Sequence, residues 1–483
     1  MDALAFEHHL NSPQGQGRLP EDGFAVTAGG YACCDEVRIS VSVRNDTVKD
    51  AGFEAHGCGA ATAAGSAAVS LVRGRTVLEA AHVGTESISG ELGGLSPAKL
   101  HAAELASDAL ARALGAAVRA RAELPRPPGG RTLVAMSGGV DSAVAALLEG
   151  ERGEPVTVTL ELWSDPDNDG EQSCCSASAV AQARALAHSM NLPHFTIDLR
   201  KEFLAGVVEP FVAGYAAGET PNPCVGCNGH VRLDGMLELA DRLGCDRLAT
   251  GHYTRVAEPE HQHGPLLRVA ADRAKDQSYM LVALSPGSLA RMRFPLGELA
   301  KPEVRRIAQA AGLPVASKVD SQDLCFMAGT DRGRFLERHG GIGARPGLLV
   351  DRGGRVLGRH RGQHLFTVGQ RRGLGLSGDE PLYVIDKHAA TNRVVVGSRA
   401  ELCSTRVAVR AAELRRAGAR VDRVKLRYRS KPIPARILGD PAPGRHPRLE
   451  LELGHAADVV APGQLACLMD GELVIGFGTI ARR

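Results

Sequence analysis

The architecture of this chain is set by one segment, Thr132-Leu133-Val134-Ala135-Met136-Ser137-Gly138-Gly139-Val140-Asp141-Ser142. Its apolar start, 132–136, predicts a buried strand, and the run Ser142-Ala-Val-Ala-Ala-Leu-Leu predicts a helix. The Gly-Gly pair between them predicts a tight turn. Such a turn directs backbone N–H groups and a helix N-terminus at one point in space, which suits a phosphate group.

The order Ser-Gly-Gly-Val-Asp-Ser resembles the PP-loop of the N-type ATP pyrophosphatases, and it lacks the Gly-Lys-Ser/Thr of a Walker A loop. An ordinary strand-to-helix turn is the alternative. The resemblance implies that Leu160 supports the adenine and that Gly251 lies beside the nucleotide. It also implies that ATP is bound by Ala135, Met136, Ser137, Gly138, Gly139, Val140, Asp141 and Ser142. Asp141 either binds Mg²⁺ or caps the helix, and the sequence leaves both readings open.

Length and composition place the chain among multidomain globular proteins. Its 483 residues predict about three or four domains, and the 44% apolar content supports well-formed cores. No apolar run approaches the roughly 20 residues that span a bilayer, and no secretory signal is evident. Eleven cysteines, an odd number, favour a reducing compartment. We therefore expect a cytoplasmic protein with no membrane partner.

Formal charge is unevenly distributed along the chain. The total is +2, but residues 1–125 carry −5 and the remainder +7. An acidic head on a basic body indicates that the body faces a polyanion, although charged solvated faces are common.

Residues 1–122 look like a separate α+β unit. We expect strands over 37–43 and 48–55, and alanine-rich helices over 60–81 and 96–120. Motifs around Ala32-Cys-Cys-Asp35, Gly57-Cys-Gly59 and Lys99-Leu-His101 resemble the NifU/IscU-type iron–sulfur scaffold. That resemblance implies a metal or cluster site made by Cys33, Asp35, Cys58 and His101, with Cys34 as a further candidate.

This head departs from the scaffold family at one position. Where the family has a third cysteine directly after the histidine, this chain has Ala102. Iron–sulfur and zinc sites favour several thiolates, so an incomplete site is expected. A degenerate scaffold that serves as a docking or fold module is the alternative.

A Pro/Gly-rich linker, 123–130, separates the head from a catalytic domain predicted over 131–335. Strands over 156–160, 195–198 and 247–251 alternate with helical segments such as 179–190. This alternation predicts a doubly wound parallel sheet, in which ligands bind at the carboxyl ends of the strands.

Further stretches resemble the tRNA-specific 2-thiouridylases. They are 220–228 (Thr-Pro-Asn-Pro-Cys-Val-Gly-Cys-Asn), 250–255, 275–279, 320–326, 366–375 and 461–464. The resemblance implies that ATP adenylates the wobble uridine of a tRNA anticodon loop and that a cysteine persulfide then supplies sulfur, which releases AMP and pyrophosphate. A cysteine desulfurase or a sulfur-relay protein is the implied donor.

The same resemblance assigns individual roles. Cys325 carries the persulfide and Cys227 is the second, nucleophilic cysteine. Asn222, Pro223 and Cys224 face the target base, which must be splayed out of its stack. Contacts to tRNA are implied for His252, Lys275, Asp276, Gln277, Arg427, Tyr428 and Gln464.

Cys224 is unusual, because the family commonly has Asp at this position. Cys224, Cys227 and Cys325 could hold three corners of a [4Fe–4S] cluster, or Cys224 could be a resolving thiol. Both readings stay open. Cys174, Cys175, Cys245, Cys403 and Cys467 are read as structural.

From about residue 336 the pattern changes to short strands, which predicts a small β-rich domain over 336–402 and a β barrel over 403–483. Expected strands cover 382–386, 392–397, 423–428, 448–453 and 464–469. Between Arg420 and Arg436 lie seven Lys/Arg and one acid. On alternating strand positions they would form a basic stripe for RNA phosphates, unless they are simply solvated.

Together these features predict a tRNA 2-thiouridine synthase, a sulfurtransferase, fused behind a scaffold-like head that passes sulfur or a cluster to Cys325. Two alternatives are a PP-loop ligase acting on a small molecule and a non-catalytic iron–sulfur assembly scaffold.

Overall fold

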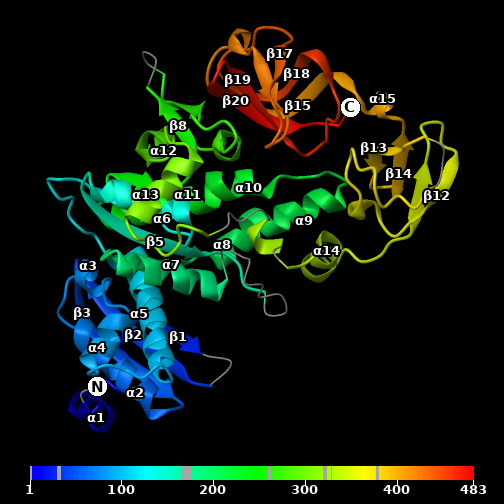
Figure 1. Cartoon of the computed structure of the whole chain (residues 1–483). Coiled ribbons are helices and arrows are strands. Elements are labelled where there is room, and N and C mark those ends of the chain that lie inside the picture. The colour runs from blue at the N-terminus through cyan, green and yellow to red at the C-terminus, as the bar shows by residue number, and fades with distance from the viewer. Residues whose placement is uncertain are drawn as a thin grey trace. The chain divides into compact units, whose positions relative to one another are not determined.

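The computed structural model describes residues 3–29, 34–165, 176–258, 263–318, 324–327, 329–376 and 380–482. The chain divides into two compact units (Figure 1). The first unit comprises Met1–Lys201, Asp234–His252 and Arg291–Phe326, and the second comprises Glu202–Leu233, Tyr253–Ala290 and Met327–Arg483. Among the described residues, no helix is long and apolar enough to cross a membrane.

The head is a three-stranded antiparallel sheet covered by helices. The strands pair in the order β1 (Phe24–Gly29), β2 (Glu36–Arg44) and β3 (Thr47–His56). The alternating valines and isoleucine of β2 are buried, as the sequence pattern predicts, and Ser40 and Ser42 between them are buried as well. The helices are α1 (Ala3–Asn11), α2 (Gly59–Val72), α3 (Val77–Ala80), α4 (Thr85–Glu91) and α5 (Leu100–Arg121).

Both predicted head helices differ from the structure at their boundaries. The pattern over 60–81 forms α2 and α3 rather than one helix, because Gly74 adopts a left-handed φ of +74° and Thr76 and Glu79 form a capping box that starts α3. The second helix begins at Leu100 rather than 96, after a turn over 97–99 that starts at Pro97. A capping box therefore overrides the alanine-rich pattern at the first point, and a turn that contains a proline does so at the second.

A five-stranded parallel sheet follows the head and confirms the predicted α/β fold. Its order is β10 (Met292–Arg293), β7 (Arg247–Ala249), β4 (Arg131–Ala135), β5 (Glu154–Glu161) and β6 (His194–Asp198). The chain leaves β4 toward β5 and β6, then returns to place β7 on the other side of β4. The strand order thus reverses at β4, and ligands of such sheets bind at that switch point.

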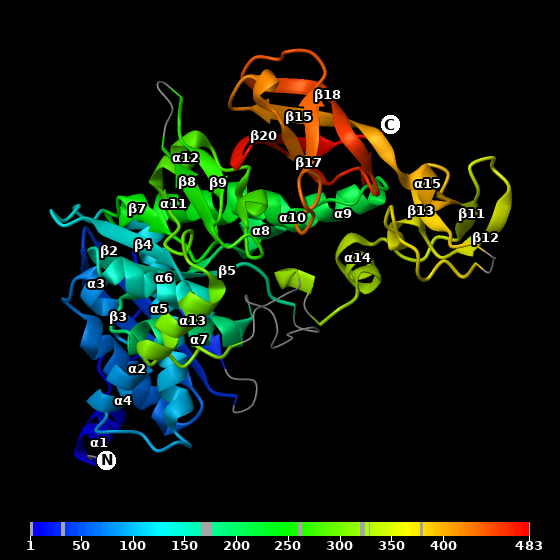
Figure 2. The same ribbon diagram turned by 45° about the horizontal axis from the view of Figure 1, so that its top comes forward.

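Helices of the same unit lie beside this sheet (Figure 2). They are α6 (Val140–Gly150), α7 (Ala177–Ser189), α11 (Leu233–Arg242) and α13 (Lys301–Ala310). Helix α6 starts two residues earlier than the Ser142 predicted from sequence, because Gly139 is its N-cap.

The head packs directly on the parallel sheet within the first unit. Gly115 of α5 lies against β6 so closely that an added Cβ would come 2.1 Å from the carbonyl oxygen of Thr196. Ala81 O accepts hydrogen bonds from His194 N at 2.9 Å and from His188 Nε2 at 3.1 Å. Two ion pairs also hold the head, Arg112 to Glu161 of β5 at 2.6 Å and Asp108 to Arg184 of the neighbouring helix over 177–189 at 2.5 Å.

The second unit contains the predicted β-rich domain and a closed barrel. The small domain is a four-stranded sheet in the order β12 (Val356–His360), β11 (Gly347–Val350), β14 (Arg393–Gly397) and β13 (Tyr383–His388). Six strands close the barrel, because β15 pairs with both β18 and β20. They are β15 (Ser404–Leu414), β18 (Gly444–Ala457), β17 (Ile433–Ile437), β16 (Arg423–Lys425), β19 (Leu465–Asp470) and β20 (Leu473–Ile480).

The predicted basic stripe over 420–436 is wrong as a continuous feature. The strand covers only Arg423–Lys425, and Lys425 is buried against Asp276 at 3.3 Å. Arg420 pairs with Asp470, Arg423 with Asp422 and Arg436 with Glu452. Acids from neighbouring strands and turns therefore neutralise four of the seven cations, and no single strand carries them all.

Candidate active site and metal centre

Hydrogen bonds of the two serines in its motif hold the loop after β4 together. Ser142 Oγ accepts from Ser137 N at 3.2 Å, lies 3.2 Å from Ser137 Oγ and donates to Gly139 O at 3.0 Å. Gly138 takes a left-handed φ of +67°, which only glycine adopts without strain. Met136 N donates to Val158 O at 2.8 Å, which continues the sheet into the loop. The loop thus holds a fixed shape at the start of α6.

The two distant residues expected near the nucleotide belong to the same unit. Leu160 is buried near the carboxyl end of β5. Gly251 lies behind the first turn of α6, where an added Cβ would come 2.7 Å from the Asp141 carbonyl carbon and 2.8 Å from Ser142 N. A glycine at 251 is therefore required by the backbone of the loop itself.

Asp141 does not cap α6, and its binding of Mg²⁺ stays a prediction. Gly139, not Asp141, is the N-cap of α6, and both carboxylate oxygens of Asp141 lie 2.8 Å from Lys301 Nζ. Lys318 Nζ also reaches this loop and donates to Gly138 O at 2.9 Å. Sequence reasoning missed both lysines; the one available signal was that the loop carries no lysine of its own.

The Asn-Pro-Cys motif is the start of a helix in the second unit. Asn222 is the N-cap of α10 (Pro223–Gly226), and its Oδ1 accepts from Cys224 N at 3.1 Å, while Pro223 occupies the first turn. Cys227 is buried and opens a π-helical turn, η2 (Cys227–Arg232). Such turns occur frequently at functional sites. Cys224 is half-buried, one turn before Cys227.

Cys325 lies in the first unit, half-buried in a short 3₁₀ turn, η4 (Cys325–Met327). Most of its motif, 320–323, falls outside the described residues, as do Cys174 and Cys175. The proposed cluster of Cys224, Cys227 and Cys325 joins residues of two units, so it stays a prediction.

Several residues expected to contact tRNA are engaged inside the second unit. Asp276 is buried and accepts from Ala270 N, Ser278 N, Ser278 Oγ and Lys425 Nζ at 2.9–3.3 Å. Gln277 exchanges two hydrogen bonds with the backbone of Tyr253. Both residues thus order this segment, and Lys275 beside them is half-buried. His252 belongs to the first unit, where its Nδ1 lies 2.8 Å from Thr250 Oγ1.

A pocket of about 350 Å³ brings two other predicted tRNA residues together in the second unit. Arg427 and Gln464 line it with Thr220, Thr367, Val368, Gly369, Gln370 and Ala461. Gln464 Nε2 donates to Thr220 O at 2.5 Å, which fixes the chain two residues before Asn222. Tyr428 lies nearby in sequence, with its ring centroid 6.3 Å from that of Tyr279.

One pocket wall is anchored by a lysine that the sequence did not indicate. Lys387 is almost fully buried, and its Nζ donates to Phe366 O at 3.0 Å and to Glu219 O at 3.3 Å. Burial lowers the pKa of Lys387 to about 7. Since Phe366 and Glu219 precede the pocket residues Thr367 and Thr220, Lys387 ties the two walls together.

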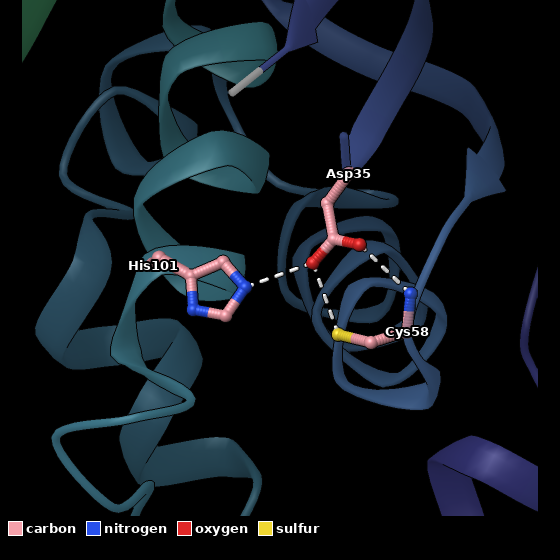
Figure 3. A group of neighbouring side chains, drawn as sticks. All are labelled: Asp35, Cys58 and His101. Atoms are coloured by element: carbon pink, nitrogen blue, oxygen red, sulfur yellow. Dashed lines mark hydrogen bonds and ion pairs between the residues drawn. The ribbon is translucent and has the colours of Figure 1, made fainter. Parts of the chain in front are cut away.

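In the head, three candidate metal ligands converge (Figure 3). Asp35 Oδ2 lies 2.8 Å from His101 Nε2 and accepts from the Cys58 thiol at 3.0 Å, while Asp35 Oδ1 accepts from Cys58 N at 2.9 Å. Hydrogen bonds from Cys58 and His101 hold the pKa of Asp35 below its usual value. Cys33 lies outside the described residues, and Cys34 is exposed with a φ of +55°.

This donor set fits a single metal ion better than a cluster. One sulfur, one nitrogen and one oxygen ligand within 4.8 Å of one another suit a borderline ion such as Zn²⁺. Iron–sulfur clusters are held mainly by thiolates, and the side chain of Ala102, fully buried, offers no donor.

Comparison with known proteins finds four family models along the chain. Family models match residues 4–122 (NifU-like N terminal domain), 130–329 (tRNA methyl transferase HUP domain), 333–398 (tRNA methyl transferase PRC-barrel domain) and 408–480 (Aminomethyltransferase beta-barrel domain).

Whole relatives are also matched over nearly their full length. The bifunctional protein NifU/MnmA of Rubrobacter xylanophilus is 44% identical over 98% of this chain and 97% of that protein. The tRNA-specific 2-thiouridylases MnmA of Acidithiobacillus ferrooxidans and Chloroflexus aurantiacus are each 42% identical over 72% of this chain and 98% of theirs. The chain therefore belongs to the MnmA family of tRNA-specific 2-thiouridylases, in the bifunctional form that carries a NifU-like domain.

Proposed function

We infer that this protein is a tRNA 2-thiouridine synthase that uses ATP. The observation that carries the inference is the match to a bifunctional NifU/MnmA protein over 98% of the chain, together with a Gly-Gly loop at the switch point of its parallel sheet. A small-molecule ligase or a non-catalytic scaffold would not require the β-rich and barrel domains that this chain shares with the 2-thiouridylases.

The chemistry needs activation before sulfur can enter. The C2 oxygen of the wobble uridine attacks the α-phosphate of ATP, which releases pyrophosphate and turns a poor leaving group into AMP. The terminal sulfur of a persulfide on Cys325 then attacks C2 and expels AMP. Cys227 attacks the sulfur of Cys325, which breaks the sulfur–sulfur bond, forms a disulfide and leaves the sulfur on the base.

For the ATP site we propose the loop Ala135–Ser142, with Leu160 and Gly251 supporting it. Mg²⁺ would enter with the nucleotide, held by phosphate oxygens and water as this ion prefers. Asp141 is a poor sole ligand for Mg²⁺, because Lys301 already neutralises its carboxylate.

For the tRNA site we propose the second unit around Asn222, Pro223 and Cys224, with Arg427 and Gln464 in the adjoining pocket. Asn222, Pro223 and Cys224 form the capped first turn of α10, which fixes their backbone. Lys275, Tyr428 and His252 are proposed to contact the tRNA directly, and Asp276 and Gln277 to act by ordering their segment. Because tRNA and ATP are its substrates, we place the protein in the cytoplasm.

For the head we propose a single bound metal ion and a role in receiving sulfur. Asp35, Cys58 and His101 supply three ligands, and Cys33 is the proposed fourth. A cysteine desulfurase or a sulfur-relay protein is the proposed donor. A cluster on Cys224, Cys227 and Cys325 remains a second hypothesis for the sulfur-transfer step.

The decisive experiment is mass analysis of tRNA nucleosides after incubation of the full chain with unmodified tRNA, ATP and a sulfur donor. We expect 2-thiouridine, and pyrophosphate release that tRNA stimulates. Pyrophosphate release stimulated by a small metabolite, with no thiolated tRNA, would instead support the ligase. Zn²⁺ or cluster binding with neither activity would support the scaffold.

A further inference from the structure

Two lysines from far along the chain hydrogen-bond the loop Ala135–Ser142, the proposed nucleotide loop. One binds a carboxylate and the other binds uncharged oxygens. Lys301, at the first position of α13, donates to both oxygens of Asp141 at 2.8 Å and is buried. Lys318 donates to Gly138 O at 2.9 Å and to the Gln182 side-chain oxygen at 3.1 Å. Both sites lie within the first unit.

The charge balance of the loop distinguishes these two lysines. The loop carries one acid, Asp141, and no lysine of its own. Lys301 neutralises that acid. The acceptors of Lys318 are a carbonyl and an amide oxygen, both uncharged, so the positive charge of Lys318 is not compensated by either of them.

ATP brings a strongly negative triphosphate to this loop. Backbone N–H groups and the dipole of α6 supply only about half an elementary charge at the helix N-terminus. Phosphate-binding loops of the Walker type meet this need with a lysine inside the motif, and here the motif has none. A lysine ammonium at the loop is a compact point charge suited to phosphate oxygens.

The backbone that carries Lys318 is itself held in place. Arg305 of α13 donates to Ala316 O at 2.9 Å and to Lys318 O at 3.1 Å. Lys318 N donates to Val315 O at 3.0 Å. Only the side chain of Lys318 therefore needs to rotate to exchange its two neutral acceptors for a phosphate.

We propose that Lys318 binds the phosphates of ATP at this loop, that Arg305 positions it, and that Lys301 acts as a counter-ion of Asp141. The inference rests on the proposed ATP site and names the cation that completes it.

The test compares two ligands that differ only in phosphate. Affinities of the full chain for ATP and for adenosine are measured by calorimetry, without tRNA, for wild type, Lys318→Gln, Lys318→Arg and the control Lys49→Gln. Lys49 is an exposed lysine on β3 of the head. Glutamine keeps a hydrogen-bond donor for Gly138 O but removes the charge.

We expect Lys318→Gln to weaken ATP binding by about 10- to 100-fold and to leave adenosine binding unchanged. Lys318→Arg should bind ATP within a few-fold of wild type, and Lys49→Gln should match wild type. Unchanged ATP affinity in Lys318→Gln, or an equal loss for ATP and adenosine, would overturn the proposal, since the residue would then be dispensable or merely structural.

This result is separable from the proposed function. Thiolation of tRNA by the wild-type chain is measured in parallel, and its absence would contradict the 2-thiouridine synthase while the contrast between ATP and adenosine still reports on Lys318.

Discussion

At the scale of single residues, Cys245 and Cys467 lie wholly inside the protein, and burial raises the pKa of each thiol to about 12. A thiol with such a pKa is almost entirely protonated near neutral pH and is a poor nucleophile. Cys227 is also buried, but it opens a π-helical turn one turn after Cys224. Their environments therefore argue against sulfur chemistry at Cys245 and Cys467, and Cys227 and Cys325 remain the proposed sites.

We predict that Cys325→Ser still forms the tRNA adenylate but makes no 2-thiouridine, because activation precedes sulfur transfer and needs no thiol. Pyrophosphate release and nucleoside mass analysis measure the two steps separately. Cys403→Ser, which changes a half-buried cysteine near Arg399 and Asp458, is the control and should thiolate normally. Normal thiolation by Cys325→Ser would assign the persulfide to another residue.

A second prediction at this scale concerns Gly251. Gly251→Ala places a Cβ under 3 Å from the backbone of Asp141 and Ser142, so the first turn of α6 must shift. We expect at least a tenfold loss of ATP affinity, since the N–H groups of that turn are the proposed phosphate ligands. Gly90→Ala is the matched control, because an added Cβ there meets nothing within 4 Å. Equal ATP affinity in the two variants would contradict the placement of the loop.

At the scale of secondary-structure elements, α7 and β6 carry two histidines into the contact with the head. Burial lowers the pKa of His188 to about 4 and that of His194 well below its usual value. His188 Nε2 hydrogen-bonds Ala81 O of the head, and repulsion from the Arg184 guanidinium lowers the pKa of His188 further. Protonation of these imidazoles is therefore disfavoured in the folded protein.

The sign of the resulting pH dependence follows from linkage. An unfolded histidine binds its proton near pH 6.5, whereas folded His188 binds it only near pH 4. The unfolded state thus holds more protons between these values, and stability that is present above pH 6.5 is lost as pH falls toward 4. From pH 7 to pH 5 the loss for His188 is on the order of 2 kcal/mol.

We expect urea unfolding to show this loss in the wild type and a smaller one in His188→Gln, which cannot titrate. His8→Gln, at an exposed position of α1, should keep the wild-type pH dependence. Identical pH slopes for wild type and His188→Gln would contradict the buried, neutral state of this histidine.

The elements also show what the sequence could and could not predict. Strands β2, β4, β5 and β6 are recognisable because an apolar run is a local signal. The basic stripe failed because Asp276 and Glu452, which neutralise Lys425 and Arg436, come from elsewhere in the chain. Lys301 and Lys318 were missed for the same reason. They lie 160 and 180 residues along the chain from their acceptors in the loop after β4.

At the scale of the whole molecule, the head and the parallel sheet belong to one compact unit. Residues 123–130, predicted as a linker, are anchored, with Leu124 N donating to Arg242 O at 2.9 Å and Arg126 paired with Asp246 at 3.4 Å. Removal of residues 1–122 would expose the edge strand β6 and leave Glu161 without Arg112. Slower thiolation by a truncated chain could therefore reflect either lost sulfur delivery or lost stability.

The fusion is best tested with point variants of the full chain. If the head receives sulfur for Cys325, Cys33→Ala and Cys58→Ala should slow thiolation when the sulfur donor is limiting and should leave the rate at saturating donor nearly unchanged. A head held against the catalytic sheet presents its cargo at a high local concentration, so its benefit disappears when free donor is abundant. Cys403→Ala is the control at both donor concentrations.

Metal content, measured on the same samples, should fall in Cys58→Ala, because that substitution removes one of the three converging ligands. Equal rates for all variants at limiting donor would leave the head as a docking module, whatever metal it binds.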